Sequence, residues 1–290
     1  MYLRILVNFC GVPETREYRS FIVRFGEIAI QISYAYMSSV DEAYTKCWIV
    51  AQDSQHILGT IGVGKVVAVG VGVDSVREGD RVAAITFSSS AQSITTASSS
   101  AIHVFNSSNY TDLDLVFIAS LSIQRQLLEL IKGVHVLIVG KDLSIIPFAL
   151  AAQQYAAKLY IIPKYTLWPD IVKGEHVSLF EDKPVSDVAV IATYDPAVVS
   201  AIPRLVKEDA TLILHPLIKK VSTLTSSAPS SFNIKTMRFG DLAVGEAMYE
   251  KLKDVIVSRV PVVKPGVFIE KPRFPSIISF IAKDVEEPSS

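Results

Sequence analysis

A glycine that directly follows an apolar run is the feature of this sequence best placed to do chemistry. Residues 134–139 read Val-His-Val-Leu-Ile-Val, and residues 140–145 read Gly-Lys-Asp-Leu-Ser-Ile. A strand that ends in glycine and opens a helix can hold the pyrophosphate of a dinucleotide on the amide groups of the first helical turn. The residues predicted to contact such a cofactor at this turn are Gly140, Lys141, Asp142, Leu143 and Ser144.

Two substitutions weaken this dinucleotide motif. Asp142 and Ile145 stand where its second and third glycines belong, so Asp142 would set a negative charge beside the pyrophosphate. In a partly dry cleft that repulsion costs on the order of 1 kcal/mol or more, which Lys141 and the helix amides would offset in part. Lys164 follows the next predicted strand and favours NADP over NAD, because a lysine can meet the 2′-phosphate. A solvated surface lysine is the alternative interpretation.

The sequence offers little for metal or thiol chemistry. Its five histidines are scattered, with no pair at the i, i+4 spacing of a helical metal site. Cys10 and Cys47 lie far apart in the chain, so neither a disulfide framework nor a zinc site is indicated. We predict that both cysteines are reduced and structural.

Composition narrows the class of protein. The 290 residues are 50% hydrophobic and 20% charged, with a net charge of -1. This balance excludes disorder and disfavours nucleic acid as a partner, because nucleic acid attracts a basic surface. No apolar stretch reaches the roughly 20 residues that cross a bilayer, and residues 1–7 run into polar sequence too early for an export signal. The expectation is a cytoplasmic globular protein with no membrane partner.

Two kinds of local pattern divide the chain. The first third has short strands with glycine turns, typical of a small antiparallel barrel, with strands expected at 27–33, 62–70 and from 82, and a weak edge strand at 91–97. The glycines of 59–64 precede a strand rather than a helix, so barrel turns and bulges explain them better than a phosphate loop.

The second pattern begins after Thr111, where an apolar strand is followed by alternating helices and strands. Alternation of this kind predicts a parallel, doubly wound sheet. Helices are expected at 121–132, 145–157, 196–207 and 243–257, and strands at 134–139, 159–162, 187–192 and 210–214. The proline-containing tail is expected to be extended or looped and to return to the first domain.

Several segments together resemble a known family. They are 26–32, 35–41, 58–64, 70–82, 186–193 and 207–214, of which 70–82 is the most specific. They resemble the medium-chain dehydrogenases/reductases. The resemblance implies a GroES-like β-barrel domain at 1–110, to which 260–290 returns, and a Rossmann-type domain with a doubly wound parallel sheet at 111–259. It also implies hydride transfer between NAD(P)H and an alcohol, aldehyde, quinone or enone.

The residues that would hold zinc in this family are replaced. Ser38 stands at the position of the first cysteine ligand, and the family's Gly-His-Glu reads Gly59-Thr60-Ile61. Hydroxyls are weak zinc ligands and isoleucine is none, so no catalytic zinc is expected. The pattern is similar to the zinc-free branch of quinone oxidoreductase-like and enoyl reductase-like proteins, although that branch keeps the glycines missing here. The sequence is identified as a degenerate member.

The resemblance also places candidate residues in a cleft. They are Tyr36, Ser38 and Asp41 as catalytic residues on the barrel side, and Lys141, Thr193, Tyr194 and His215 on the sheet side. Of the latter, Thr193 and His215 join Lys141 as expected cofactor-binding residues. A serine or tyrosine hydroxyl could donate to a substrate carbonyl during hydride addition. Asp41 has a second interpretation, as the cap of a helix at 42–46. His215 stands where the family usually has glycine, so it has a second interpretation as a side chain that fills nicotinamide space.

Two functions remain open from the sequence. The first is a zinc-independent oxidoreductase that reduces a small-molecule carbonyl, quinone or enone with NADP(H). The second is a catalytically inactive family member that serves as a binding or scaffold protein, because both the metal and the phosphate motifs are eroded. Residues 232–239 resemble the edge strand through which family members pair, so we predict a homodimer.

Overall fold

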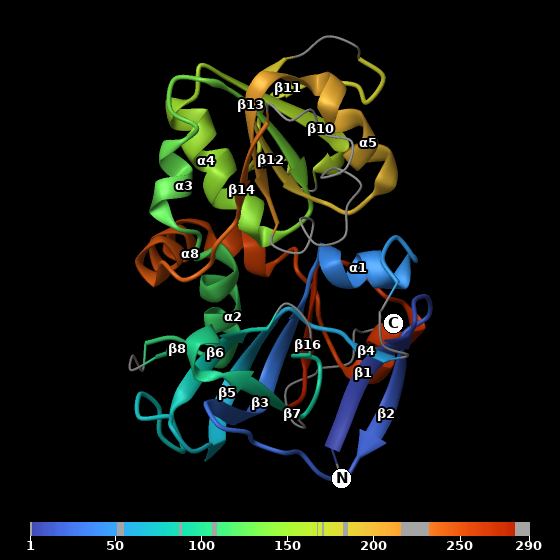
Figure 1. The fold of residues 1–290 in the computed structure, drawn as a ribbon, viewed down its shortest axis with the longest axis vertical. Helices are drawn as coiled ribbons and strands as arrows, with labels where there is room; N and C mark the ends of the chain where they lie inside the picture. The colour runs from blue at the N-terminus through green and yellow to red at the C-terminus, as the bar shows by residue number, and fades with distance from the viewer. Residues whose placement is uncertain are drawn as a thin grey trace. The chain divides into compact units, whose positions relative to one another are not determined.

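The computed structural model describes residues 2–50, 55–86, 89–105, 109–166, 168–169, 171–181, 185–215 and 232–281. The chain divides into two compact units (Figure 1). Unit 1 comprises Met1–Ala119 and Leu252–Ser290, and unit 2 comprises Ser120–Lys251. No helix in the described ranges is long and apolar enough to span a membrane.

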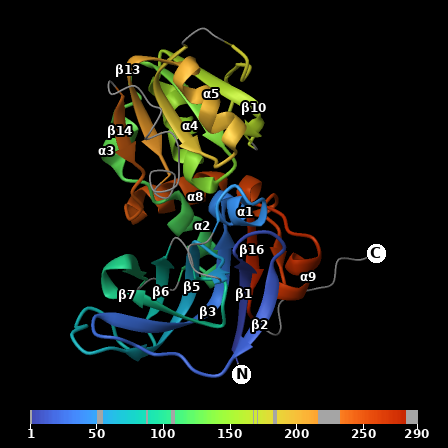
Figure 2. The same ribbon diagram turned by 45° about the vertical axis from the view of Figure 1, so that its right-hand side comes forward.

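Unit 1 is built around one long strand, β3 (Glu27–Met37). It pairs antiparallel with β5 (Ile61–Val69) along one side, and with β7 (Ile94–Ser98) and then β16 (Ser276–Ser279) along the other. The other strands of this unit are β1 (Tyr2–Asn8), β2 (Glu14–Tyr18), β4 (Gln55–Ile57), β6 (Arg81–Ile85), β8 (Ile102–Val104) and β15 (Val262–Val263). All these strands together form a three-stranded sheet, β2-β1-β4, and a larger sheet in the order β15-β16-β3-β5-β6-β8, with β7 beside β3. Figure 2 labels β1 and β2 of the first sheet and β16, β3, β5, β6 and β7 of the second.

Helices complete unit 1. They are α1 (Ser39–Thr45), α2 (Asp112–Leu121) and α9 (Pro265–Glu270), with a 3₁₀ turn at Ser99–Ala101. The chain crosses between the units within α2 and again within α8 (Leu242–Val257). Because β16 pairs with β3, the proline-containing tail packs as part of unit 1.

Glycine allows β3 and β5 to approach closely. A Cβ at Gly64 would lie 1.9 Å from the carbonyl oxygen of Gln31, and the pairing shifts register between Ile32 and Tyr34. Gly59 adopts a positive φ of 94°, and a Cβ there would lie 2.4 Å from the amide nitrogen of Ala91. The prediction that barrel turns and bulges explain these glycines is therefore confirmed.

Unit 2 is a parallel sheet in the order β11-β10-β9-β12-β13-β14. If the strands of this unit are numbered from one to six along the chain, their order in the sheet is 3-2-1-4-5-6. This is the order of a dinucleotide-binding sheet. The strands are β9 (His135–Gly140), β10 (Lys158–Thr166), β11 (Glu175–His176), β12 (Ser186–Ala192), β13 (Val206–Leu214) and β14 (Asn233–Thr236). The predicted fold class is thus confirmed.

Helices accompany the strands of unit 2. They are α3 (Arg125–Glu129), α4 (Ile146–Tyr155), α5 (Pro196–Leu205) and the first part of α8, with a 3₁₀ turn η2 (Leu143–Ile145) before α4. Strands β9 and β12 are buried almost throughout because they lie inside the sheet. This explains the continuous apolar runs in the sequence.

Three predicted segments were wrong in detail. The expected apolar strand after Thr111 is helix α2, and the expected helix at 121–132 is only the short α3. The chain is extended at Ser122–Gln124, because Ile123 forms a β-bridge with Phe239 and the amide of Gln124 donates to Arg238 O at 3.0 Å. These partners lie more than 100 residues away, where a local pattern does not reach.

The third segment is the weak edge strand expected at 91–97. It begins only at Ile94. The backbone of Ala91 instead bonds to β1 and to the residue after β4, since its carbonyl accepts from Ile5 N and its amide donates to Leu58 O, each at 2.8 Å.

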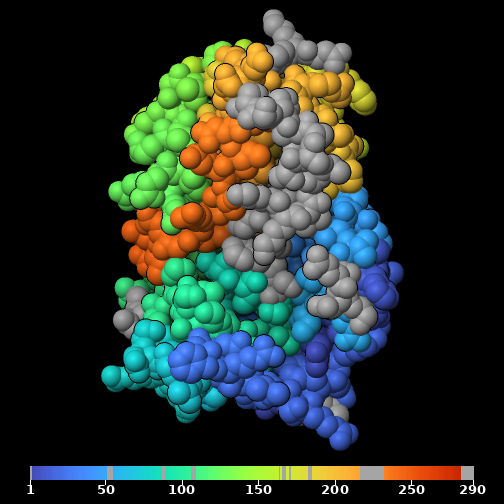
Figure 3. Space-filling view, in the orientation of Figure 1, coloured from blue at the N-terminus to red at the C-terminus, as the bar shows by residue number. Residues whose placement is uncertain are grey.

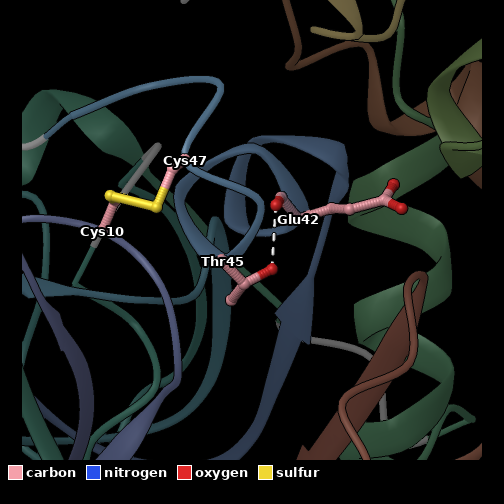
Figure 4. Close-up of a disulfide and its surroundings, with 4 residues drawn as sticks. All are labelled: Cys10, Glu42, Thr45 and Cys47. Atoms are coloured by element: carbon pink, nitrogen blue, oxygen red, sulfur yellow. Dashed lines mark hydrogen bonds between the residues drawn. A yellow bond between two sulfur atoms is a disulfide. The ribbon is translucent and has the colours of Figure 1, made fainter.

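The prediction of two reduced cysteines was also wrong. Cys10 and Cys47 form a disulfide whose Cα atoms lie 5.0 Å apart (Figure 4). Cys10 lies in the turn between β1 and β2, and Cys47 follows the C-terminal end of α1. The amide of Gly11 donates to Tyr44 O at 2.9 Å and holds this turn against the helix. Only the fold makes the cysteines neighbours, because they are 37 residues apart in sequence.

Loss of this disulfide should destabilise the protein. We expect Cys47→Ser to lower the free energy of unfolding by about 2–4 kcal/mol, because the cross-link restricts a long loop of the unfolded chain. Urea unfolding of the full chain, with and without a phosphine reductant, measures this change. The reductant should have the same effect on the wild type and none on Cys47→Ser. An unchanged wild-type midpoint in reductant would contradict the assignment.

Candidate functional site

The end of β3 and the start of α1 bring the three predicted catalytic residues together in unit 1. Ser38 is the N-cap of α1, and Asp41 is the third residue of the helix, so the two form a capping box. Asp41 Oδ2 accepts from the Ser38 amide at 2.8 Å and from Ser38 Oγ at 3.3 Å. The alternative prediction, that Asp41 is the N-cap of this helix, was wrong. Ser38 is the N-cap, and Asp41 is its partner in the capping box.

Asp41 also fastens the loop before β5. Its Oδ1 accepts from the Gly59 amide at 2.7 Å, so one carboxyl group ties a helix, a strand end and a glycine turn together. Asp41 is fully buried. Burial raises its pKa from 3.8 to about 6, although its hydrogen bonds from Ser38 and Gly59 act in the opposite direction.

Ser38, Thr60 and Ile61 stand at the positions that hold zinc in the family that the sequence resembles. The two hydroxyl groups bond to protein backbone groups instead, and the isoleucine has no atom that can bind a metal. Ser38 Oγ accepts from the Val40 amide at 3.2 Å, and Thr60 Oγ1 donates to Tyr36 O at 3.3 Å. Ile61 is buried and apolar. Within the described ranges, no group of three or more His, Cys, Asp or Glu side chains is placed to hold a metal ion.

In unit 2 the carboxyl ends of three strands bring the other predicted residues to one edge of the sheet. Gly140 of β9 pairs with Ala192 of β12, and the amide of His215 after β13 donates to Ile191 O at 3.0 Å. Thr193 directly follows β12, and its hydroxyl accepts from the Asp195 amide at 3.3 Å. Ligands of doubly wound sheets bind at this edge, at the point where the strand order reverses. Here that point lies between β9 and β12.

The turn after β9 fits a nucleotide phosphate at two residues. A Cβ at Gly140 would lie 2.8 Å from Ala192 O, so glycine is required for the strands to pair. Ser144 Oγ, at the start of the helical segment, is buried without a hydrogen-bond partner among the residues that the structure describes. A buried hydroxyl without a partner costs about 1–3 kcal/mol, which a ligand acceptor at the helix start would recover.

The same turn departs from a nucleotide site at two other residues. Asp142 is only 2% exposed and its side chain makes no helix-capping hydrogen bond. Ile145 is fully buried where a glycine would let helix and strand approach most closely. Leu143 is fully buried as well, so its side chain contributes packing at this turn.

His215 is held by an aromatic group at the strand ends. Its Nδ1 lies 2.7 Å from the hydroxyl of Tyr194, and its ring lies edge-on to Phe239 with centroids 6.2 Å apart. Burial lowers the pKa of His215 to about 3, so the ring is neutral at physiological pH. Tyr194 and His215 are both buried. This pair supports the interpretation of His215 as a space-filling side chain.

Trp168 is a site residue that the sequence did not reveal. It is 2% exposed, and its Nε1 donates to the carbonyl of Lys141 at 3.0 Å, so it covers the turn after β9. In the sequence, the only indication of a role for this residue was an isolated Trp-Pro pair after a predicted strand. Lys164 lies in β10, two residues before the Thr166 that pairs with Gly140, and its side chain is exposed.

The chain is similar to a known protein family over part of its length and to solved structures over most of it. Residues 24–110 match the alcohol dehydrogenase GroES-like domain. A search of curated proteins finds no match. A quinone oxidoreductase from Pseudomonas syringae is similar in structure, with a TM-score of 0.61, 16% identity, and coverage of 96% of this chain and 100% of the other.

Two further solved structures are similar. The apo JamJ enoyl reductase has a TM-score of 0.60 at 16% identity, covering 96% of this chain and 99% of that one. A mycobacterial protein solved with NADPH has a TM-score of 0.58 at 14% identity, covering 93% and 94%. The chain has the fold of the medium-chain dehydrogenase/reductase superfamily. The resemblance drawn from the sequence is thus confirmed, with unit 1 supplying the GroES-like domain.

The buried Asp41 should make stability fall as pH rises. Its raised pKa means that the folded state holds a proton that the unfolded state releases, so stability present below about pH 4 is lost by about pH 6. The loss should be about 3 kcal/mol. We expect Asp41→Asn to remove this part of the decline, as measured by urea unfolding between about pH 4 and pH 7. Asp74→Asn, at an exposed position of the same unit, is the control. Equal pH profiles for the wild type and Asp41→Asn would contradict the burial of a titrating carboxyl group.

Proposed function

We propose that the protein is a zinc-independent oxidoreductase that reduces a small carbonyl, quinone or enone with NADP(H). The observation that carries this proposal is the hydroxyl of Ser144, which is buried where a helix begins at the switch point of the sheet and has no partner within the described part of the chain. The bound cofactor would supply the hydride. The NADPH found in a structural neighbour supports a cofactor of this class.

Four residues would hold the cofactor phosphates. Gly140 gives the close backbone approach, Ser144 gives a hydroxyl donor, and Lys141 and Lys164 give positive charge, with Lys164 suited to the 2′-phosphate. Thr193 and His215 follow the neighbouring strands at the same edge. Asp142 opposes this binding, so we expect weak affinity.

In unit 1, Ser38 and Tyr36 would act through their hydroxyl groups. Tyr36 could donate to the developing oxyanion of a substrate carbonyl, and Ser38 could do so once its hydroxyl hydrogen turns from Asp41 Oδ2, to which it donates at 3.3 Å, toward the substrate. Asp41 would hold Ser38 in place, since it accepts from both the amide and the hydroxyl of that residue. The proposal includes no zinc, because Ser38, Thr60 and Ile61, at the positions that resemble the family's zinc ligands, supply no strong zinc ligand.

A second candidate function has its own supporting observation. The buried Asp142 and the Tyr194–His215 pair occupy the strand ends with a carboxyl group and two rings. Side chains in these positions favour a catalytically inactive member that works as a binding or scaffold protein.

The cytoplasmic location expected from the sequence stays a prediction, and the Cys10–Cys47 disulfide weighs against it because disulfides are rare in reducing compartments.

Titration with NADPH, followed by cofactor fluorescence, distinguishes the two functions. We expect micromolar binding by the wild type and about fivefold tighter binding by Asp142→Gly, which removes roughly 1 kcal/mol of repulsion. Glu181→Gln removes an exposed charge elsewhere in unit 2 and should leave the affinity unchanged.

Three outcomes of this titration decide between the candidates. If neither the wild type nor Asp142→Gly binds at millimolar NADPH, the reductase proposal is wrong. Binding by Asp142→Gly alone would indicate a wild-type protein that has lost the cofactor, which is the second candidate. Binding by both variants would support the first.

The predicted homodimer has a structural basis in β14. This strand pairs only with β13 among the described strands, so it ends the sheet and leaves one side of its backbone without a strand partner. Exposed edges of this kind pair readily with a second copy. Light scattering at micromolar concentration should give the mass of two chains, and a monomer mass would contradict the prediction.

A further inference from the structure

A groove in unit 2 lies between the helices that cover one face of the sheet. It has a volume of about 310 Å³ and is lined mainly by residues of α3, α4 and α8. Figure 1 shows where these three helices lie in the fold. In the space-filling view, α3 and α4 (green) and the segment of β14 and α8 (orange) adjoin on this face (Figure 3). The volume is at the lower end of the roughly 300–1,000 Å³ typical of small-molecule sites.

Small side chains leave the space open. Ala243 and Ala247 are one helical turn apart on α8, and Ala151 faces the same groove from α4. Leu150 and Met248 line it beside them. The wall is therefore aliphatic, and methionine adapts to flexible apolar ligands.

The rim of the groove is positively charged. Glu129 is paired with Lys132, whose ammonium group also lies 5.4 Å from the centre of the Tyr155 ring. Arg125 and Lys251 line the same groove, and the side chain of neither forms an ion pair or hydrogen bond with another residue that the structure describes. Two cationic side chains without partners among the described residues thus flank an aliphatic surface.

We propose that this groove binds a single-chain aliphatic carboxylate. The chain would lie on the alanines and Met248, and the carboxylate would pair with Arg125 or Lys251. A second copy of the protein is disfavoured as the occupant, since the two cationic rims would repel each other. A phosphate ion is disfavoured because the wall gives it an aliphatic surface.

The groove is separate from the strand ends where the cofactor is proposed. Its α4 residues, from Leu150 to Tyr155, lie toward the C-terminal end of that helix, whereas the turn at Gly140 precedes its N-terminal end. The proposal therefore does not depend on NADPH binding, and NADPH should not compete with the carboxylate.

Calorimetry with decanoate and decylammonium, both below their micelle concentrations, tests the proposal. We expect decanoate to bind the full-length protein and decylammonium to bind at least about fivefold more weakly. Arg125→Glu and Lys251→Glu should each weaken decanoate binding by about fivefold. Lys173→Glu, an exposed lysine of unit 2 outside the groove, should have no effect.

Two further variants distinguish loss of the binding site from loss of folding. Ala247→Trp should fill the groove and abolish binding, with thermal melting as the check that the variant is folded. The double variant Arg125→Glu with Lys251→Glu should prefer decylammonium, a gain that an unfolded protein would not show. Equal binding of both amphiphiles, equal effects of Lys251→Glu and Lys173→Glu, or no heat with decanoate would each overturn the proposal.

Discussion

Parallel pairing of β9 with β10 on one side and β12 on the other is the constraint on which unit 2 depends. This pairing buries β9 almost throughout. Because the strands are parallel, it also places their carboxyl ends at the same edge of the sheet. Gly140 is needed because any side chain there would meet the backbone of β12. The one glycine retained from the dinucleotide motif is therefore also the one that strand pairing demands.

This double role explains how the motif could erode in part. The glycines replaced by Asp142 and Ile145 serve cofactor approach and helix packing, whereas Gly140 also serves the sheet itself. Trp168, Tyr194 and His215 fill the same edge with rings that bond to the backbone or to each other. Packing at this edge is thus maintained by the chain's own side chains, and the Ser144 hydroxyl is left without a partner within it.

Unit 1 has a comparable centre in α1, a helix of seven residues. A helix this short is not stable alone. Its N-terminal end is held by Ser38, Asp41 and Gly59, and its C-terminal end by the Cys10–Cys47 disulfide (Figure 4). The side chain of Glu42 points away from the disulfide in this view, while its carbonyl accepts from Thr45 Oγ1 at 2.8 Å. The candidate catalytic residues therefore lie on a segment anchored at both ends.

Local patterns in the sequence were enough for the strands predicted at 27–33, 62–70, 134–139, 187–192 and 210–214, because strand period, apolar runs and glycine turns are properties of neighbouring residues. They also located the turn at 140–145. The expectation that Ser38, Thr60 and Ile61 replace zinc ligands came from the family resemblance and stays a prediction. The disulfide, the break at Ser122–Gln124, the Asp41–Gly59 bond and the Trp168 contact were decided only by the tertiary structure. Each of these joins residues that are distant in sequence, and their energy depends on which surfaces the packed fold brings together.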